Sequence, residues 1–63
     1  MPWDEAYYPP AMQHLPAPVR AKAIAIANAL LGEGHDDGSA IRIAIARAKA
    51  WALQHGLSLE DLP

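Results

Sequence analysis

The chain has 63 residues and no cysteine, which limits it to one domain and excludes a disulfide framework or a thiolate metal site. Its net charge of -2 gives no sign of a membrane protein, and no apolar run reaches the ~18 residues that span a bilayer. Because the N-terminal segment also lacks the basic start and apolar run of a signal peptide, we expect a soluble cytoplasmic protein with no membrane contact.

Residues 1–15 are rich in proline and aromatic side chains. We expect an extended arm through Pro9 and then a short helical turn from Pro10 to His14, because proline fits the first turn of a helix. The two helices that follow are built mainly of alanine and isoleucine and lack large rings. The aromatic residues predicted to cover this helix pair are Trp3, Tyr7, Tyr8 and, from the second helix, Trp51.

The first helix is predicted over residues 17–31, where no proline follows Pro18 and apolar side chains recur at helical spacing. Its predicted buried stripe consists of Val19, Ala23, Ile26, Ala27 and Leu30, with Ile24 and Leu31 at the edges. The alanines on the other side of the helix leave a smooth surface on which another chain can sit.

A connection rich in glycine and acids, GEGHDDG, separates the helices. Gly32 suits a left-handed C-cap for the first helix, and Asp36 or Asp37 suits the N-cap of the second. Glu33 and His35 add two further metal-ligating side chains, yet the spacing does not match a calcium loop. We therefore assign these residues to capping and turn formation, with divalent-cation binding by the loop as the alternative.

The second helix, SAIRIAIARAKAWALQ, is the longest helical run. At about 100° per residue, its buried stripe consists of Ile41, Ala44, Ile45, Ala48 and Ala52, with Trp51 at the margin. Because a short link makes two amphipathic helices antiparallel neighbours, the predicted fold is all-α, a small antiparallel two-helix hairpin with an aromatic arm packed over it. The predicted single domain, 1–63, is divided into the arm (1–15), a helix (17–31), the connection (32–38), a helix (39–54) and a short C-terminal turn (55–63).

The sequence offers little for catalysis. It has no cysteine or threonine, and Ser39 and Ser58 lie where helix caps and first turns are expected. His14 and His55 lie at segment ends, and no glycine-rich phosphate loop is present. We therefore predict that the protein is not an enzyme, that it has no cofactor, and that no residue is catalytic or metal-ligating.

All five Lys and Arg residues fall in the two predicted helices, and all seven Asp and Glu residues lie outside them. Helix-end electrostatics and solubility account for this pattern, but Arg42, Arg47 and Lys49 also suit contact with an anionic partner. We expect a protein partner or self-association, because the core is small and apolar residues such as Ile43 and Leu53 are left over. Nucleic acid bound by Arg42 and Lys49 is the alternative, although a third helix and base-reading side chains are missing.

One pattern covers most of the chain, roughly residues 1–52. It is carried by Pro2, Trp3, Tyr8, Pro9, Leu15, Pro16, Val19, Arg20, Lys22, Ala23, Ile24, Ile26, Ala27, Asn28, Ala29, Glu33, Gly34, Gly38, Ala40, Ile41, Ile43, Ala44, Lys49, Ala50, Trp51 and Ala52. It resembles the N-terminal region of the YdaT type of small bacterial proteins of unknown function. The resemblance implies a bacterial cytosolic protein linked to stress responses, with no catalytic residues to carry over. A more distant likeness, in the Leu-Pro start and the closing Ala-Trp-Ala, reaches ChaB-type proteins, described as cation-transport regulators.

Overall fold

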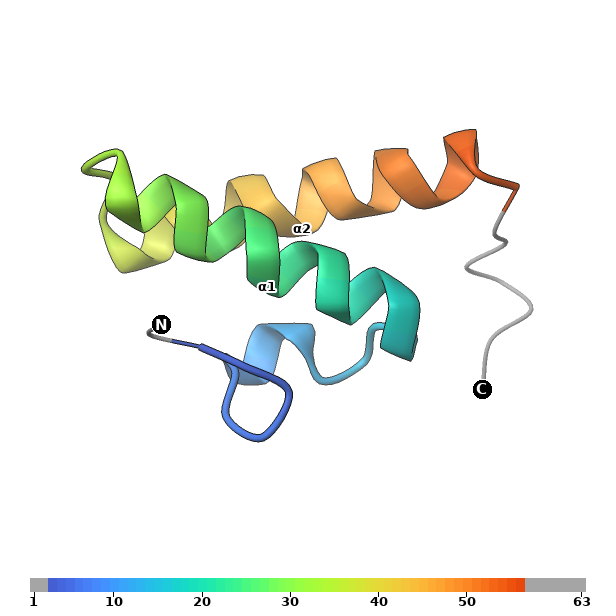
Figure 1. Ribbon diagram of the computed structural model, residues 1–63, viewed down its shortest axis with the longest axis horizontal. Helices are drawn as coiled ribbons and strands as arrows, with labels where there is room; N and C mark the ends of the chain where they lie inside the picture. Colours follow the sequence, from blue (N-terminus) through green and yellow to red (C-terminus); the bar gives the residue numbers. More distant parts are fainter. Residues whose placement is uncertain (1–2, 57–63) are drawn as a thin grey trace.

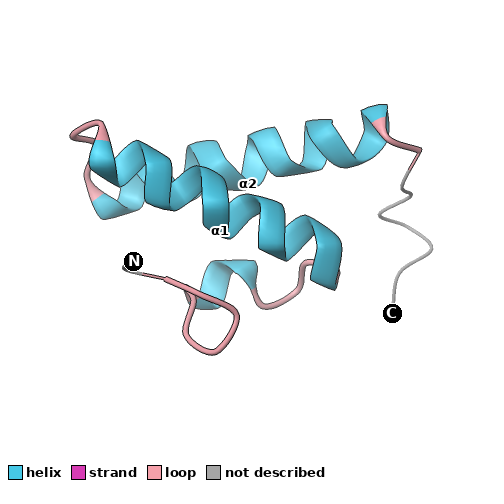
Figure 2. Cartoon of the chain, viewed as in Figure 1, coloured by secondary structure: helices cyan, strands magenta, loops and turns pink. Residues whose placement is uncertain are grey.

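Figure 1 shows the computed structural model of this chain, which describes residues 3–56. Two α-helices, α1 (Ala17–Gly32) and α2 (Asp37–Gln54), lie side by side and run in opposite directions, and a short 3-10 helix, η1 (Pro10–Met12), precedes them. Apart from one isolated bridge in the arm, the regular structure of the described range is helical (Figure 2). The predicted all-α antiparallel hairpin is confirmed. Neither α1 nor α2 is long and apolar enough to cross a membrane.

Small side chains form the contact between α1 and α2. The most deeply buried residues of α2, each 0% exposed, are Ala40, Ala44, Ala48 and Ala52. Those of α1 are Val19, Ala23 and Ala27. Side chains this short let two helix axes approach to the lower end of the usual ~8–10 Å range. The stripes predicted from helical spacing are confirmed, although the isoleucines at 26, 41 and 45 lie at the edges of the contact and are only partly buried.

The end of α1 differs from the prediction. The residue with left-handed backbone is Gly34 (φ 101°) and not Gly32, which is the last residue of the helix. The His35 N–H donates to the Leu30 carbonyl at 3.1 Å and thereby satisfies a carbonyl at the helix end. The prediction of a left-handed cap at Gly32 was wrong because the helix continues through this glycine before the chain turns.

The start of α2 is set by Asp36, which serves as its N-cap. Its Oδ1 accepts the Ser39 N–H at 2.8 Å, which satisfies one of the unpaired donors of the first turn. The helix therefore begins at Asp37 rather than at Ser39 as predicted. At the other end, Gly56 adopts left-handed backbone (φ 77°) directly after the helix. The remainder of the predicted C-terminal turn, 57–63, lies outside the described residues.

The arm contains a tight turn from Asp4 to Tyr7, so the prediction of an extended arm through Pro9 was wrong. Asp4 N donates to Tyr7 O at 2.8 Å, and Tyr7 N donates to Asp4 O at 3.1 Å. The Asp4 carboxylate also accepts the N–H groups of Ala6 and Tyr7, both at 2.8 Å. Aspartate commonly stabilises turns in this way, because its short side chain reaches the backbone two or three residues ahead. The signal was therefore present in the sequence.

Residues at η1 and just after it supply part of the core. Met12 is 0% exposed and Leu15 is 3% exposed, and both belong to the cluster that contains the buried alanines of α2. The helical turn predicted from Pro10 to His14 is present, and its regular part spans Pro10–Met12. Neither apolar residue was predicted to lie in the core. The hairpin is thus closed by aliphatic side chains as well as by rings.

Candidate interaction surface

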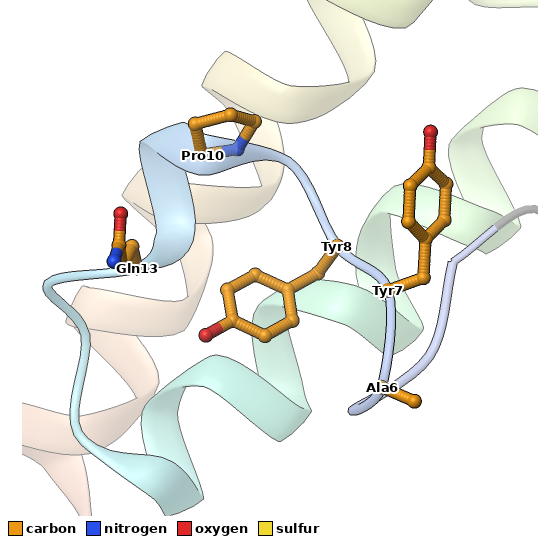
Figure 3. A pocket seen from close by; sticks show the side chains of 5 residues that line it. All are labelled: Ala6, Tyr7, Tyr8, Pro10 and Gln13. Carbon is orange, nitrogen blue, oxygen red and sulfur yellow. The ribbon is translucent and has the colours of Figure 1, made fainter.

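The four aromatic residues predicted to cover the helices do not behave alike. Trp3, Tyr8 and Trp51 are partly buried and pack against the core. Tyr7 is 72% exposed, so the predicted covering role does not hold for this residue. Successive side chains of an extended segment point to opposite sides, and Tyr8 takes the inward direction. The two tyrosine rings accordingly point in different directions in Figure 3.

Asn28 of α1 holds the arm in place, a role that sequence reasoning missed. Its Nδ2 donates to the Trp3 carbonyl at 2.9 Å, and its Oδ1 accepts the Trp3 N–H at 3.2 Å. One side-chain amide therefore satisfies both backbone groups of a residue 25 positions away in the chain. Asn28 is 8% exposed, and a buried amide requires partners. An asparagine between alanines on a predicted helix was the signal that could have revealed it.

Replacing Asn28 by alanine is expected to lower the free energy of unfolding by about 1–2 kcal/mol, because two hydrogen bonds to Trp3 are lost together. Urea denaturation measures this change. In a Trp51→Phe background the remaining indole is Trp3, and its fluorescence should shift to longer wavelength as the arm detaches. Gln13→Ala, which removes an exposed amide, should stay within about 0.5 kcal/mol of the parent. An unchanged Trp3 spectrum in the Asn28 variant would contradict the assigned role.

Arg20 also joins the arm to α1. Its Nε lies 3.1 Å from the Glu5 Oε2, and its Nη1 donates to the Leu15 carbonyl at 3.0 Å. Its guanidinium carbon lies 5.0 Å from the centre of the Tyr8 ring. The Glu5 carboxylate is largely exposed, so screening by water makes this ion pair a weak contribution to stability. Because Arg20 already has partners within the chain, it does not belong to a free basic surface.

Two shallow hollows flank the arm. One lies beside the tight turn and is lined by Ala6, Tyr7, Tyr8, Pro10 and Gln13 (Figure 3). The other lies between the arm and α1 and is lined by Trp3, Asp4, Glu5, Ala21, Ile24, Ala25 and Asn28. None of these lining residues is a serine, cysteine, histidine or lysine. Neither hollow therefore pairs a nucleophile with a base, which nucleophilic catalysis requires.

The three cations predicted to contact a partner lie on two different sides of α2. Arg42 and Lys49 are two helical turns apart and share one side, whereas Arg47 lies ~140° around the helix from Arg42. Arg42 and Arg47 are exposed, and Lys49 is partly buried. Among the described residues, the one ion pair within 4.0 Å involves Arg20. The structure thus brings Arg42 and Lys49 together and separates Arg47 from them.

The acids and the histidine of the connection do not converge. No group of three or more His, Asp or Glu side chains in residues 3–56 is arranged to hold a metal ion. Asp36 acts as the cap, and the hydrogen bond from the Ser39 backbone N–H holds the pKa of its carboxyl below the ordinary value. His35 and Glu33 are exposed. The geometry of these residues accords with capping and turn formation.

Asp36→Ala is expected to lower the melting temperature, by less than the core substitutions described below, because α2 loses its cap. Since folding lowers the pKa of Asp36, the charged cap stabilises the fold above the unfolded pKa of ~3.9. That contribution is lost as the pH falls through the lower pKa of the folded state. Thermal melts should therefore show a gap between the parent and the variant that closes in acid. A gap that stays constant with pH would contradict this assignment.

Comparison with known proteins identifies one relative. Over 52 residues, the chain is 52% identical to "Uncharacterized protein YdaT" of Bacillus subtilis (strain 168). The matched region covers 82% of this chain and 35% of that protein, so the chain spans about a third of the length of its relative. The predicted resemblance to this type of bacterial protein is confirmed. No protein-family model matches the chain, and no solved structure matches it.

Proposed function

We propose, from the relationship to YdaT, that this chain is a noncatalytic interaction module of the bacterial cytoplasm, which binds another protein or a second copy of itself. The observation that carries the proposal is a set of apolar side chains on α2 that the core does not use. Leu53 is 66% exposed, and Ile43 is partly exposed and lies outside the cluster that forms the core. A chain this small gains much of its stability from covering such residues.

The surroundings of Leu53 support a protein partner. Leu53 lies one turn beyond Lys49 and on the same side of α2 as Arg42. The cations of this side have no carboxylate partner among the described residues. Protein interfaces commonly surround an apolar contact with charged and polar groups that select the partner. This side of α2 therefore fits a protein surface that offers an apolar pocket and carboxylates.

Support for a noncatalytic role comes from the placement of the reactive side chains. Ser39 lies in the first turn of α2, where its N–H is held by the Asp36 cap. His14, His35 and His55 are exposed and lie at three different ends of helical segments. General acid–base chemistry needs such groups within hydrogen-bond reach of a common substrate. Their dispersal favours binding over chemistry.

Photo-crosslinking tests the proposal. A benzophenone amino acid placed at Leu53 in the full chain, expressed in a bacterial host, should give a discrete adduct with a protein partner or a second copy. The matched control carries the same group at Ala11, an exposed position in the arm. An adduct at position 53 that is absent at position 11 supports the assignment. Equal labelling at both positions, or none at position 53, overturns it.

The proposal extends to stress, which the resemblance to YdaT-type proteins implies. If the chain takes part in a stress response, its abundance in its host should rise after heat, ethanol or salt challenge. Quantitative mass spectrometry before and after each challenge measures this. A constant level under all three treatments contradicts the stress role and leaves the interaction role to the crosslinking experiment.

Nucleic acid is the second candidate, because Arg42 and Lys49 lie on one side of α2 without a carboxylate partner. Two turns of helix separate them by ~10 Å, which suits contact with neighbouring phosphates. Labelled DNA and RNA titrated at low salt should then bind, and binding should weaken steeply with salt. The Arg42→Ala and Lys49→Ala double variant should lose it. Binding that this variant retains, or no binding at all, rejects the candidate.

A further inference from the structure

A second surface of the hairpin combines apolar residues with ordered charge, and we call it the charged face. It is formed by Lys22, Ile26 and Glu33 on α1 and by Asp36, Ile43 and Arg47 at the start and along the length of α2. Within each set of three, the helical spacing of 100° per residue places the members within about 40° of one another. The four charged members are exposed, and the two isoleucines are partly exposed.

The two halves of the charged face lie on the same side of the hairpin. The Lys22 Nζ of α1 lies 5.5 Å from the ring centre of Trp51 in α2. Trp51 follows Arg47 by one turn, so this contact brings the α1 stripe beside the α2 stripe. On α1 this stripe is opposite Ile24, which borders the hollow beneath the arm. The charged face is therefore the side of the hairpin that the arm leaves open.

Charge on this face runs from one end to the other. Lys22 precedes Glu33 by eleven residues, and Asp36 precedes Arg47 by eleven, a separation of ~16 Å along each helix. Because α1 and α2 are antiparallel, both cations lie toward the open end of the hairpin, and both acids lie at the connection. The isoleucines, with the exposed Ala29 and Ala50 beside them, occupy the middle.

We propose that the charged face docks on the same face of a second copy of this chain, with the helices of the two copies antiparallel about a two-fold axis. This inference rests on the proposed interaction role and specifies its partner. The two-fold turn places Lys22 of one copy opposite Glu33 of the other, and Arg47 opposite Asp36, so each attraction forms twice. The parallel arrangement would set acids against acids and cations against cations.

Size and side-chain volume fit this arrangement. The chain measures 33 × 22 Å across its two longer dimensions, which is near the ~800 Å² that each partner buries in a standard interface. The alanines in the middle of the face are small enough for a helix of the second copy to approach closely. Two hairpins stacked in this way form an antiparallel four-helix bundle whose centre covers Ile26 and Ile43.

Sedimentation of charge-swapped chains tests the proposal. The parent should form a dimer at high micromolar concentration, and the dimer should weaken with salt. Lys22→Glu sets like charges opposite each other and should raise the dissociation constant at least about tenfold. The double variant Lys22→Glu, Glu33→Lys restores opposite charges and should dimerise again. The matched control Arg42→Glu makes the same charge change away from the face and should leave the dimer intact, with helical circular dichroism checked for every variant.

A single cysteine tests the geometry independently, because the chain contains none. Ala29→Cys lies near the two-fold axis and should form a disulfide-linked dimer on mild oxidation, whereas Ala25→Cys, on another side of α1, should not. A strictly monomeric parent, a double variant no better than Lys22→Glu, or equal oxidation of the two cysteine variants overturns the inference. Failure here with a heterologous adduct at Leu53 removes the dimer alone, whereas the absence of any adduct removes the interaction role as well.

Discussion

Replacing Met12 by alanine is expected to lower the free energy of unfolding by about 2–5 kcal/mol, because it empties a fully buried site. Met12 belongs to a cluster that contains residues of both helices, so its loss weakens the docking of the arm and the hairpin together. A chain of 63 residues is expected to have a total stability of only about 3–9 kcal/mol. Urea denaturation followed by circular dichroism should therefore show a variant close to unfolding in water.

The control for this experiment is Met12→Leu, which keeps an aliphatic side chain of similar volume and should cost less than about 1.5 kcal/mol. Equal destabilisation by alanine and leucine would show that the shape of the methionine matters more than the filled volume. A fully stable alanine variant would mean that the arm contributes nothing to the hairpin, contrary to the burial of Met12.

Replacing Ala48 by leucine is the second change with a large expected effect, about 2–3 kcal/mol of destabilisation. Ala48 is 0% exposed in the middle of the alanine ridge of α2, and α1 lies directly against that ridge. A leucine there must push the helices apart or adopt a strained rotamer. Thermal denaturation should show a lower melting temperature, and the near-ultraviolet signal of Trp51 should weaken as its packing loosens.

Ala46→Leu provides the matched comparison, because Ala46 is an exposed alanine on the same helix. The same added volume at this position meets solvent, so stability should change by no more than about 0.5 kcal/mol. If both variants behave alike, the alanine ridge does not determine how closely α1 and α2 pack.

The two helices could be predicted because their physical signal is periodic and local. Alanine and isoleucine recur at helical spacing in both segments, and a short polar connection leaves the antiparallel pair as the simple arrangement. The error at the end of α1 is also local. Gly32 and Gly34 are both glycines that can adopt left-handed backbone, and local sequence does not decide which of them the tertiary contacts select.

The arm could be predicted only in part, because its structure depends on contacts distant in sequence. Met12 and Leu15 stand in a stretch without helical or strand periodicity, so no pattern marks them as buried. Tyr7 and Tyr8 are chemically alike, and only the turn at Asp4 decides which ring faces inward. Asn28 lies within a helical stretch where its backbone partner, Trp3, cannot be inferred from spacing.

The candidate surface shows the same division. The cations of α2 were identified from the sequence, but their distribution over two sides follows from helix geometry, which also separates Arg47 from Arg42. Which cations are already occupied could not be predicted. Arg20 is paired with Glu5 across a tertiary contact, whereas Lys22, two residues later, lies over the Trp51 ring of the neighbouring helix.

The difference in contact range within this small fold sets an order of assembly. Between α1 and α2 the chain passes through Glu33 to Asp36 alone, so the hairpin closes a very short loop at little entropic cost, whereas Trp3 must find Asn28 across 25 residues. Local helical contacts of this kind form within microseconds to milliseconds. On a translating ribosome the arm emerges first, yet its binding site on α1 does not exist until Asn28 has followed. The earliest part of the chain to be synthesised is thus the last to reach its native position.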